Sequence, residues 1–147
     1  MRSTLSFNFD RESLQQFDAQ CEVAISKLGH GTRKATVAAC QEIIQASLNQ
    51  VPSATGTLAS SIYYEISGNY KIGFSGVVGY GGNGNPVNPT TGEAVSEYMV
   101  AVHENMSAEH PNGKAKFLED PVREYARENF PRTVFKYAQE SLADMSL

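Results

Sequence analysis

Hydrophobic residues in the first third of the chain recur at spacings of three and four, which is typical of amphipathic helices. Asp10 favours an N-cap, and the first stripe after it comprises Leu14, Phe17, Cys21, Ile25 and Leu28. This stripe predicts a helix of about five turns. Gly29-His30-Gly31 is expected to break that helix, and Thr32 is expected to cap a second one. The second stripe comprises Val37, Cys40, Ile44, Leu48 and Val51.

The stretch VPSATGTLASSIYYEI, residues 51–66, marks a change from helix to strand. Pro52 ends the helix because it lacks a backbone donor, and Gly56 permits the backbone angles of a tight turn. Apolar and polar positions then alternate, and one face comprises Leu58, Ile62, Tyr64 and Ile66. A strand is therefore expected from Leu58 to about Ile66.

Other segments show the same period of two. Gly68-Asn69 is a predicted hairpin turn, and Gly76 is expected to mark a bulge in the strand after it. One face of that second strand comprises Tyr70, Ile72 and Phe74. The third predicted strand comprises Tyr98, Val100 and Val102 with the residues between them. Near the N-terminus, an edge strand or docking arm is indicated by Leu5, Phe7 and Phe9.

Polar loops separate these segments. Residues 81–96 read GGNGNPVNPTTGEAVS, and a loop of this length is uncommon in a compact domain unless it is functional or disordered. A second polar loop covers residues 104–116. Asp120 and Pro121 then predict the start of a C-terminal helix, which Pro131 is expected to kink. The apolar face of that helix comprises Val122, Ala126, Phe130, Val134, Ala138 and Leu142.

The order of the elements indicates an α+β fold, because helices are segregated from an antiparallel sheet. We expect two N-terminal helices, a small antiparallel sheet of three to four strands with long loops, and a kinked C-terminal helix. The 147 residues suit one domain with its own core, covering residues 1–147. Such a small sheet has open edges, which serve as docking surfaces in an assembly.

Charge and composition narrow the class of function. The net charge of −4 argues against a general nucleic-acid-binding protein, which would carry a basic excess. No apolar run approaches the roughly 20 residues of a membrane span, and the first residues lack the apolar region of a secretory signal. We therefore expect the protein to stay where it is made, with Cys21 and Cys40 as buried, reduced thiols.

Candidate chemistry is sparse. His103-Glu104 with His110 resembles a metal motif, but the zincin pattern requires a second His where Ser107 stands. In the glycine-rich loop, prolines follow where a phosphate-binding loop would run straight into a helix N-terminus, and the loop has no Lys, so it does not match a phosphate-binding motif. No nucleophile motif surrounds Ser53, Ser60 or Ser61. We expect no catalytic residue, no metal site and no cofactor.

Four segments in order, VPSATGTLASSI, VGYGG, YMVAVHEN and GKAKFLEDPV, resemble the tail-completion or neck proteins of tailed bacteriophages. This family is typified by the gene-ten product of phage HK-ninety-seven. The resemblance extends from about Val37 to the C-terminus. The positions that carry it are Val51, Pro52, Thr55, Gly56, Leu58, Ser61, Ile62, Tyr98, Ala101, Val102, Glu104, Phe117, Leu118 and Pro121.

The resemblance implies a noncatalytic virion protein of the head-tail junction, assembled in the host cytoplasm. It would form a homo-oligomeric ring of six or twelve subunits between a portal or connector protein and a tail terminator or tail-tube protein. DNA would pass through without specific binding, which an acidic chain favours. We expect subunit and partner contacts in the long loop and at the strand edges, with the loop positions Tyr80, Asn83, Asn85, Pro86, Val87, Asn88 and Pro89.

Two alternatives stay open from the sequence. A tail-tube terminator shares the ring geometry but contacts the tail side first. A small metal-dependent enzyme would use His103, Glu104 and His110.

Overall fold

The computed structural model describes residues 10–52, 54–107 and 112–143. Helices precede and follow one small antiparallel sheet along these residues, so the α+β class is confirmed. The elements are α1 (Arg11–Leu48), α2 (Thr57–Ser60), β1 (Tyr63–Asn69), β2 (Gly73–Gly79), α3 (Val95–Glu104), α4 (Glu119–Glu128) and α5 (Phe130–Leu142). The strand or arm predicted at Leu5, Phe7 and Phe9 lies outside the described residues.

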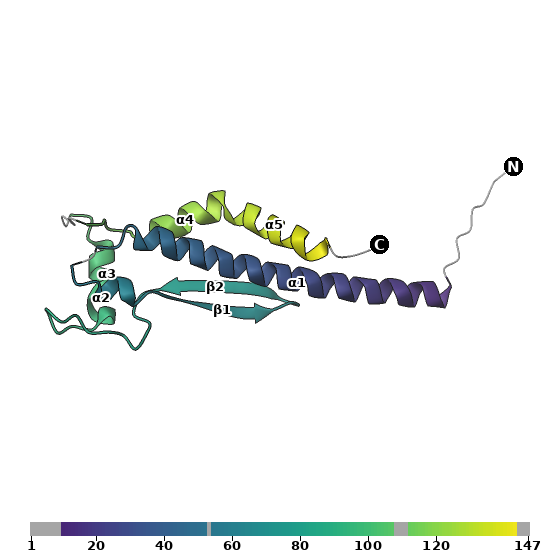
Figure 1. Cartoon of the computed structure of the whole chain (residues 1–147), viewed down its shortest axis with the longest axis horizontal. Helices are drawn as coiled ribbons and strands as arrows, with labels where there is room; N and C mark the ends of the chain where they lie inside the picture. Colours follow the sequence, from purple (N-terminus) through teal and green to yellow (C-terminus); the bar gives the residue numbers. More distant parts are fainter. Residues whose placement is uncertain (1–9, 53, 108–111, 144–147) are drawn as a thin grey trace.

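The 38-residue helix α1 is the element around which the others pack (Figure 1). At 1.5 Å per residue it is about 57 Å long. Helices α4 and α5 lie along one side of α1, and the β1–β2 hairpin lies along the other. The result is three thin layers, of which α1 is the middle one.

The prediction of two N-terminal helices is wrong, because α1 continues through Gly29 and Gly31. Both glycines are buried by close neighbours. A Cβ atom at Gly29 would lie 2.3 Å from the Cβ of Tyr70, and one at Gly31 would lie 2.7 Å from the Oγ of Ser141. The glycines therefore allow the hairpin and α5 to approach α1, and α1 tolerates their low helix propensity.

The hairpin forms, but its turn differs from the prediction. Strands β1 and β2 pair antiparallel from Tyr63↔Gly79 to Asn69↔Gly73, so the turn lies at residues 70–72 and not at Gly68-Asn69. The side chain of Asn69 fixes this turn, because its Oδ1 accepts from the N–H groups of Lys71 and Ile72 at 2.9 and 3.2 Å. Tyr70 and Ile72 are thus turn residues rather than strand residues.

Gly76 does not form a bulge. It pairs in regular register with Ile66. A Cβ atom at Gly76 would lie 2.5 Å from the Sγ of Cys40 and 3.0 Å from the Cγ2 of Thr36. A glycine inside a strand also occurs where another element approaches closely, and here that element is α1.

The strand expected to begin at Leu58 begins later, at Tyr63. Residues 57–60 instead form one helical turn, α2, in which the N–H of Ser60 donates to the carbonyl of Gly56 at 2.9 Å. This turn directs Leu58 into the core, where only 5% of it is exposed. The apparent alternation from Leu58 to Ile66 therefore spans two elements.

The third predicted strand is helix α3, so the described part of the chain contains a two-stranded sheet and not three or four strands. Glu97 favours the helix because its Oε2 accepts from the backbone N–H of Ala94 at 2.7 Å. Val95, Met99 and Val102 then share the face toward the core, at positions i, i+4 and i+7. Because α3 begins at Val95, the long loop ends at residue 94.

The C-terminal helical segment bends as predicted but is divided at Asn129 into α4 and α5. Pro131 occupies the first turn of α5, where its missing N–H does no harm. Asp120 is not the N-cap, because α4 starts at Glu119. The predicted face is wrong in α4, where the buried residues are Pro121 and Tyr125; Val122, Ala126 and Phe130 are exposed.

Candidate interaction surfaces

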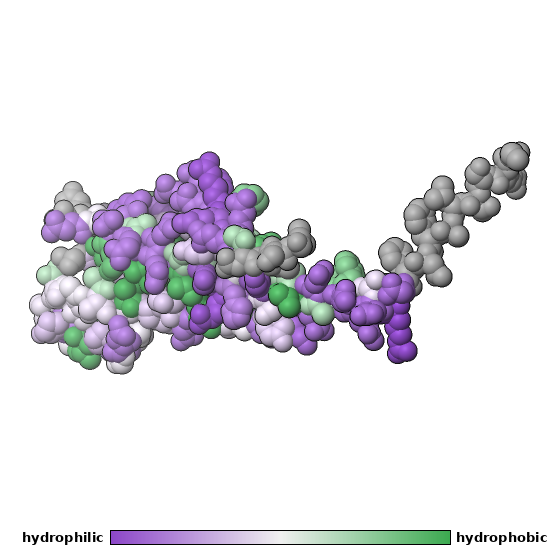
Figure 2. Space-filling view, turned by 45° about the vertical axis from the view of Figure 1, so that its right-hand side comes forward, coloured by the Kyte–Doolittle hydropathy of each residue, from purple (hydrophilic) through white to green (hydrophobic). Residues whose placement is uncertain are grey.

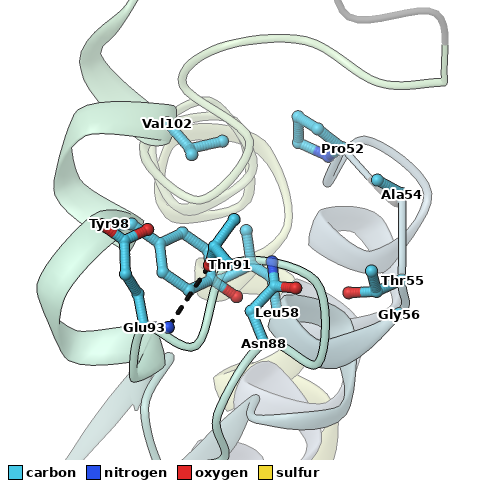
Figure 3. A pocket seen from close by; sticks show the side chains of 10 residues that line it. All are labelled: Pro52, Ala54, Thr55, Gly56, Leu58, Asn88, Thr91, Glu93, Tyr98 and Val102. Carbon is cyan, nitrogen blue, oxygen red and sulfur yellow. Dashed lines mark hydrogen bonds between the residues drawn. The ribbon is translucent and has the colours of Figure 1, made fainter.

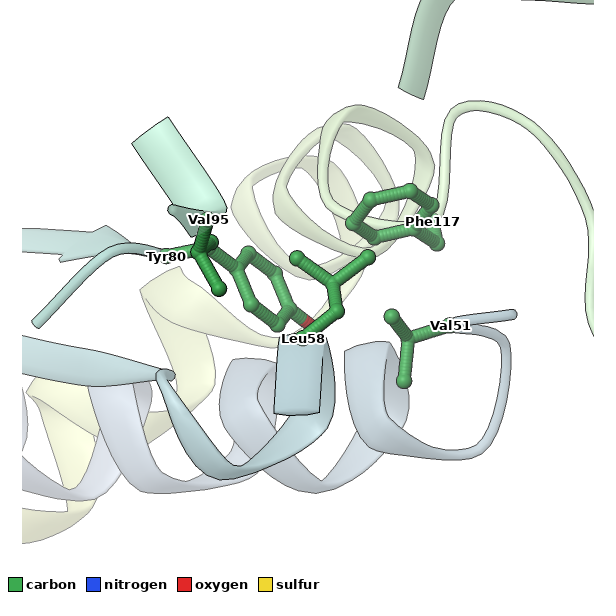
Figure 4. Close-up of a cluster of buried hydrophobic side chains, with 5 residues drawn as sticks. All are labelled: Val51, Leu58, Tyr80, Val95 and Phe117. Atoms are coloured by element: carbon green, nitrogen blue, oxygen red, sulfur yellow. The ribbon is translucent and has the colours of Figure 1, made fainter. Parts of the chain in front are cut away.

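The segments that carry the family resemblance meet in one buried cluster at the C-terminal end of α1 (Figure 4). Their side chains point toward one another although they come from four separate parts of the chain. The rings of Tyr80 and Phe117 meet edge to face, with centroids 5.2 Å apart and planes at 88°. The buried members are Val51, Leu58, Tyr80, Val95 and Phe117. Val51, Leu58 and Phe117 thus have a structural role in the core.

Ser61 connects the residue 51–66 corner to the start of the long loop. Its buried Oγ donates to the carbonyl of Leu58 at 2.7 Å and accepts from the N–H of Gly81 at 3.1 Å. The N–H of Gly82 donates to the carbonyl of Ser61 at 2.9 Å. The hydroxyl of Ser61 therefore joins the corner to the loop through backbone groups on both sides.

The same corner and the long loop enclose a pocket of about 350 Å³ (Figure 3). Gly56 adopts φ +75°, a left-handed conformation that favours glycine and that the tight turn requires. The walls are mixed apolar and polar, with corner residues on one side and residues of the loop and α3 on the other. The lining residues are Pro52, Ala54, Thr55, Gly56, Leu58, Asn88, Thr91, Glu93, Tyr98 and Val102.

Internal hydrogen bonds hold the long loop in place. Asn85 and Ser96 bond twice, from Asn85 Nδ2 to Ser96 Oγ at 2.7 Å and from Ser96 N to Asn85 Oδ1 at 2.9 Å. Asn83 Nδ2 donates to the carbonyl of Ser60 at 3.0 Å, and Val87 forms an isolated bridge with Ala94. Hydrogen bonds of asparagine side chains thus stabilise the conformation of this loop.

The predicted contact residues separate into three groups by burial. Tyr80 is 6% exposed and belongs to the core, so its side chain does not offer a surface to a partner. Asn85, Pro86 and Asn88 are half-buried. The exposed members of the set are Asn83, Val87 and Pro89, and Val87 is 57% exposed.

His103 and Glu104 take part in a structural cluster at the end of α3. His103 Nε2 accepts from the backbone N–H of Glu119 at 3.3 Å, so its neutral ring carries the proton on Nδ1, which donates to Glu104 Oε1 at 2.8 Å. Lys116 Nζ pairs with both Glu104 and Glu119. His110 lies outside the described residues, and within those residues no group of three or more potential ligands is placed to hold a metal ion.

Hydrogen bonds from Lys116 and then from His103 lower the pKa of Glu104, and Lys116 likewise lowers the pKa of Glu119. The pKa of Lys116 is raised, first by its hydrogen bond to Glu104. Each carboxylate is therefore held in the charged form that pairs with the lysine. The cluster fastens the segment before α4 to the end of α3.

Residues Arg11–Leu28 of α1, which we call the free half, extend beyond the packed body (Figure 1). Figure 2 shows hydrophobic side chains between hydrophilic ones along this half. Its apolar residues form the stripe, defined as Leu14, Phe17, Cys21, Ile25 and Leu28; all are exposed except Cys21, which is half-buried. The sequence pattern identified this stripe, but it predicted a core face rather than a surface.

A second apolar surface lies between α1, β2 and α4, and we call it the groove. Its volume is about 510 Å³. Exposed apolar side chains line it, including Val77 at 53%, Val122 at 38% and Phe130 at 40%. One sequence signal points to this groove: the helical spacing of Val122, Ala126 and Phe130 indicates an apolar face but not its surroundings.

No family model matches the chain, and no curated protein or solved structure is significantly similar to it. The described helices include none with the length and apolar content needed to cross a membrane.

Proposed function

We propose that this protein is a structural subunit of the head-tail junction of a tailed bacteriophage. Its subunits form a ring that joins the connector to the tail and lets DNA pass. The observation that carries the proposal is the free half of α1, which presents its apolar stripe to solvent. Burial against other subunits would remove this exposed apolar surface from water.

The free half has few contacts that would stabilise it in a single subunit, which supports an assembled state. A helix of about 18 residues gains little from local propensity alone, and most helices are stabilised by packing of their apolar face. Its visible local support is the cap at Asp10, whose Oδ1 accepts from the N–H of Ser13 at 2.8 Å. Packing in a ring would supply the missing tertiary contacts.

The chemistry of the surfaces also favours a noncatalytic role. The hydroxyl of Ser61, the ring nitrogens of His103 and the carboxylate of Glu104 all bond to neighbouring protein groups. These residues stabilise corners and helix ends. The net charge of −4 favours a channel wall to which DNA phosphates do not adhere.

Size-exclusion chromatography with light scattering tests the proposal. The purified protein is measured alone, with a portal or connector protein, and with a tail-tube protein. We expect a closed oligomer alone or on one of these partners, and the partner that promotes it identifies the side of the junction. A protein that stays monomeric and binds neither partner would contradict the proposal.

A further inference from the structure

We propose that the stripe on the free half of α1 docks into the groove of a second copy of this chain. The contact is head to tail, because it joins two different surfaces of the two copies. It rests on the proposed ring-forming function and specifies which surfaces join the subunits.

The stripe continues a face of α1 that is covered elsewhere in the same chain. Leu28 and Gly31 are three positions apart on one side of the helix, and α5 packs against Gly31 through Ser141 and Tyr137. Toward the N-terminus this face is exposed, with Leu14 at 49%, Phe17 at 62% and Ile25 at 52%. The free half therefore presents to solvent the kind of face that α5 covers in the body.

The groove is concave, apolar and open. Gly76 on its floor has no side chain, and Cys40 and Thr36 of α1 lie directly behind it. The rim residues Val77 and Val122 keep much of their surface in solvent. A volume of about 510 Å³ lies in the range of pockets that bury most of a guest's surface.

The dimensions of the two surfaces agree. The strand wall from Phe74 to Val78 is about 13 Å long, and the helical wall from Val122 to Phe130 is about 12 Å long. Leu14, Phe17 and Cys21 span about 11 Å along α1 at positions i, i+3 and i+7. This is the spacing with which an amphipathic helix places anchors in a groove.

The charge of the free half is opposite to the charge near one end of the groove. Residues 10–22 contain four carboxylates and one arginine, which gives this end of α1 a net charge of −3. At the end of the groove near Thr36 and Phe130, Arg33 lies one turn before Thr36, and Arg132 follows Phe130 by two residues. Residues 129–139 contain no acidic residue. Opposite charges would orient the free half in the groove.

A chain cannot place its own stripe in its own groove. The groove is lined by Thr36 to Ile43 of α1 itself, at least 22 residues beyond Leu14 on one continuous helix. That separation is about 33 Å. A second copy can supply the stripe, and repetition of such a heterologous contact produces a ring when the rotation between copies closes.

Charge substitutions at the two surfaces test the contact. Phe17→Glu places a carboxylate in the stripe, and Val122→Glu places one on the rim of the groove. The matched control for the first is Val23→Glu, because Val23 is 50% exposed and lies about 180° from Leu14 around α1. Val100→Glu, at a residue 59% exposed on α3, is the control for the second. Circular dichroism and thermal melting check that every variant folds.

We expect the wild-type protein and both controls to self-associate, while Phe17→Glu and Val122→Glu each weaken association by about thirtyfold or more, the loss typical of a central interface anchor. Mixing the two defective variants should give a dimer that does not grow. The reason is that Phe17→Glu retains an intact groove and Val122→Glu retains an intact stripe. Sedimentation velocity distinguishes monomer, dimer and ring. If association requires the connector, the same variants are compared in its presence.

Two results would overturn the inference and leave the ring proposal standing. The first is a ring formed equally well by Phe17→Glu or Val122→Glu. The second is a pair of defective variants that yield no dimer on mixing, which would indicate a symmetric contact or another occupant of the groove. A wild-type protein that neither self-associates nor binds a connector or tail-tube protein would overturn both proposals.

Discussion

The hydroxyl groups of Ser47 and Tyr80 lie 2.7 Å apart in the buried core, although the two residues are 33 positions apart in sequence. This bond joins the last turn of α1 to the residue after β2. Burial raises the pKa of Tyr80, and the bond to Ser47 partly offsets that rise. The phenol therefore stays protonated and holds the helix to the hairpin.

Ser47→Ala should lower the free energy of unfolding by about 1–3 kcal/mol, because it leaves the buried hydroxyl of Tyr80 without its partner. Tyr80→Phe should have a smaller effect, since Ser47 lies in α1 and its hydroxyl can donate instead to a backbone carbonyl one turn earlier. The double variant should lose less than the sum of the two single losses. Urea unfolding of all four proteins measures this coupling, and strictly additive losses would show that the bond contributes nothing.

Gly29→Ala should destabilise the protein, in contrast to the gain of about 1 kcal/mol that this change gives in an ordinary helix. The new Cβ would meet the Cβ of Tyr70 at 2.3 Å and push the hairpin away from α1. Ser26→Ala, on the exposed free half, is the control and should be neutral or stabilising. Thermal unfolding compares them, and a higher melting temperature for Gly29→Ala would contradict the packing described.

Gly56→Val should destabilise the corner by about 1–2 kcal/mol, because a β-branched residue is strained in the left-handed conformation. Gly56→Asn should cost less, since Asn tolerates that conformation. The space around Gly56 is open within 4 Å, so backbone strain and not a clash decides the outcome. Equal stability of the Val and Asn variants would contradict this account, and ring formation should fall in step with stability.

The sequence was sufficient for features that local chemistry determines. The helical stripe from Leu14 to Leu28, the N-cap at Asp10 and the glycine turn at Gly56 all depend on neighbours within a few residues. The antiparallel hairpin and the bend near Pro131 were also predictable. These features were predictable because short-range spacing, capping and turn residues indicate them, although the hairpin turn lies two residues later than predicted.

Features decided by distant contacts were not predictable. Gly29 and Gly31 were expected to break a helix, but Tyr70 and Ser141 stabilise the continuous α1 by packing against them. Residues 98–102 fit a strand period as well as a helical one, and the cap from Glu97 together with the core face of α3 selected the helix. The exposure of the stripe was also not predictable from the sequence, because periodicity shows that a face is apolar but not what covers it.

Acid should loosen the junction between α3 and α4. The pKa values of Glu104 and Glu119 lie below their ordinary value of 4.5, so the stabilisation is complete above pH 4.5 and is lost as the pH falls through the lowered values. Lys116→Gln removes the shared partner and should flatten this dependence. Melting temperatures measured from neutral pH down to about pH 3 test it, and parallel curves for the two proteins would contradict the assignment.

Assembly should protect the free half of α1 and, within the body, mainly the residues of the groove. Cys21 is half-buried in the stripe, whereas Cys40 is 3% exposed, so a thiol reagent should modify Cys21 first in dilute protein. Docking of the stripe should slow that reaction as the protein concentration rises. Amide hydrogen exchange within residues 11–28 should slow in parallel. An unchanged labelling rate in a demonstrated oligomer would place the subunit contact elsewhere.

The close packing at Gly29 and Gly31 divides α1 into two parts with different tolerance to substitution. From residue 29 onward the hairpin and α5 pack against the helix, so a library of variants should accept few changes at the positions that face them. Before residue 29, folding of the single chain should tolerate almost any helix-compatible substitution. Positions at a spacing of three or four residues that do not tolerate substitution would therefore be those needed for assembly. The two maps, one selected for folding and one for virion formation, should therefore separate before residue 29 and at the groove, and coincide in the rest of the body.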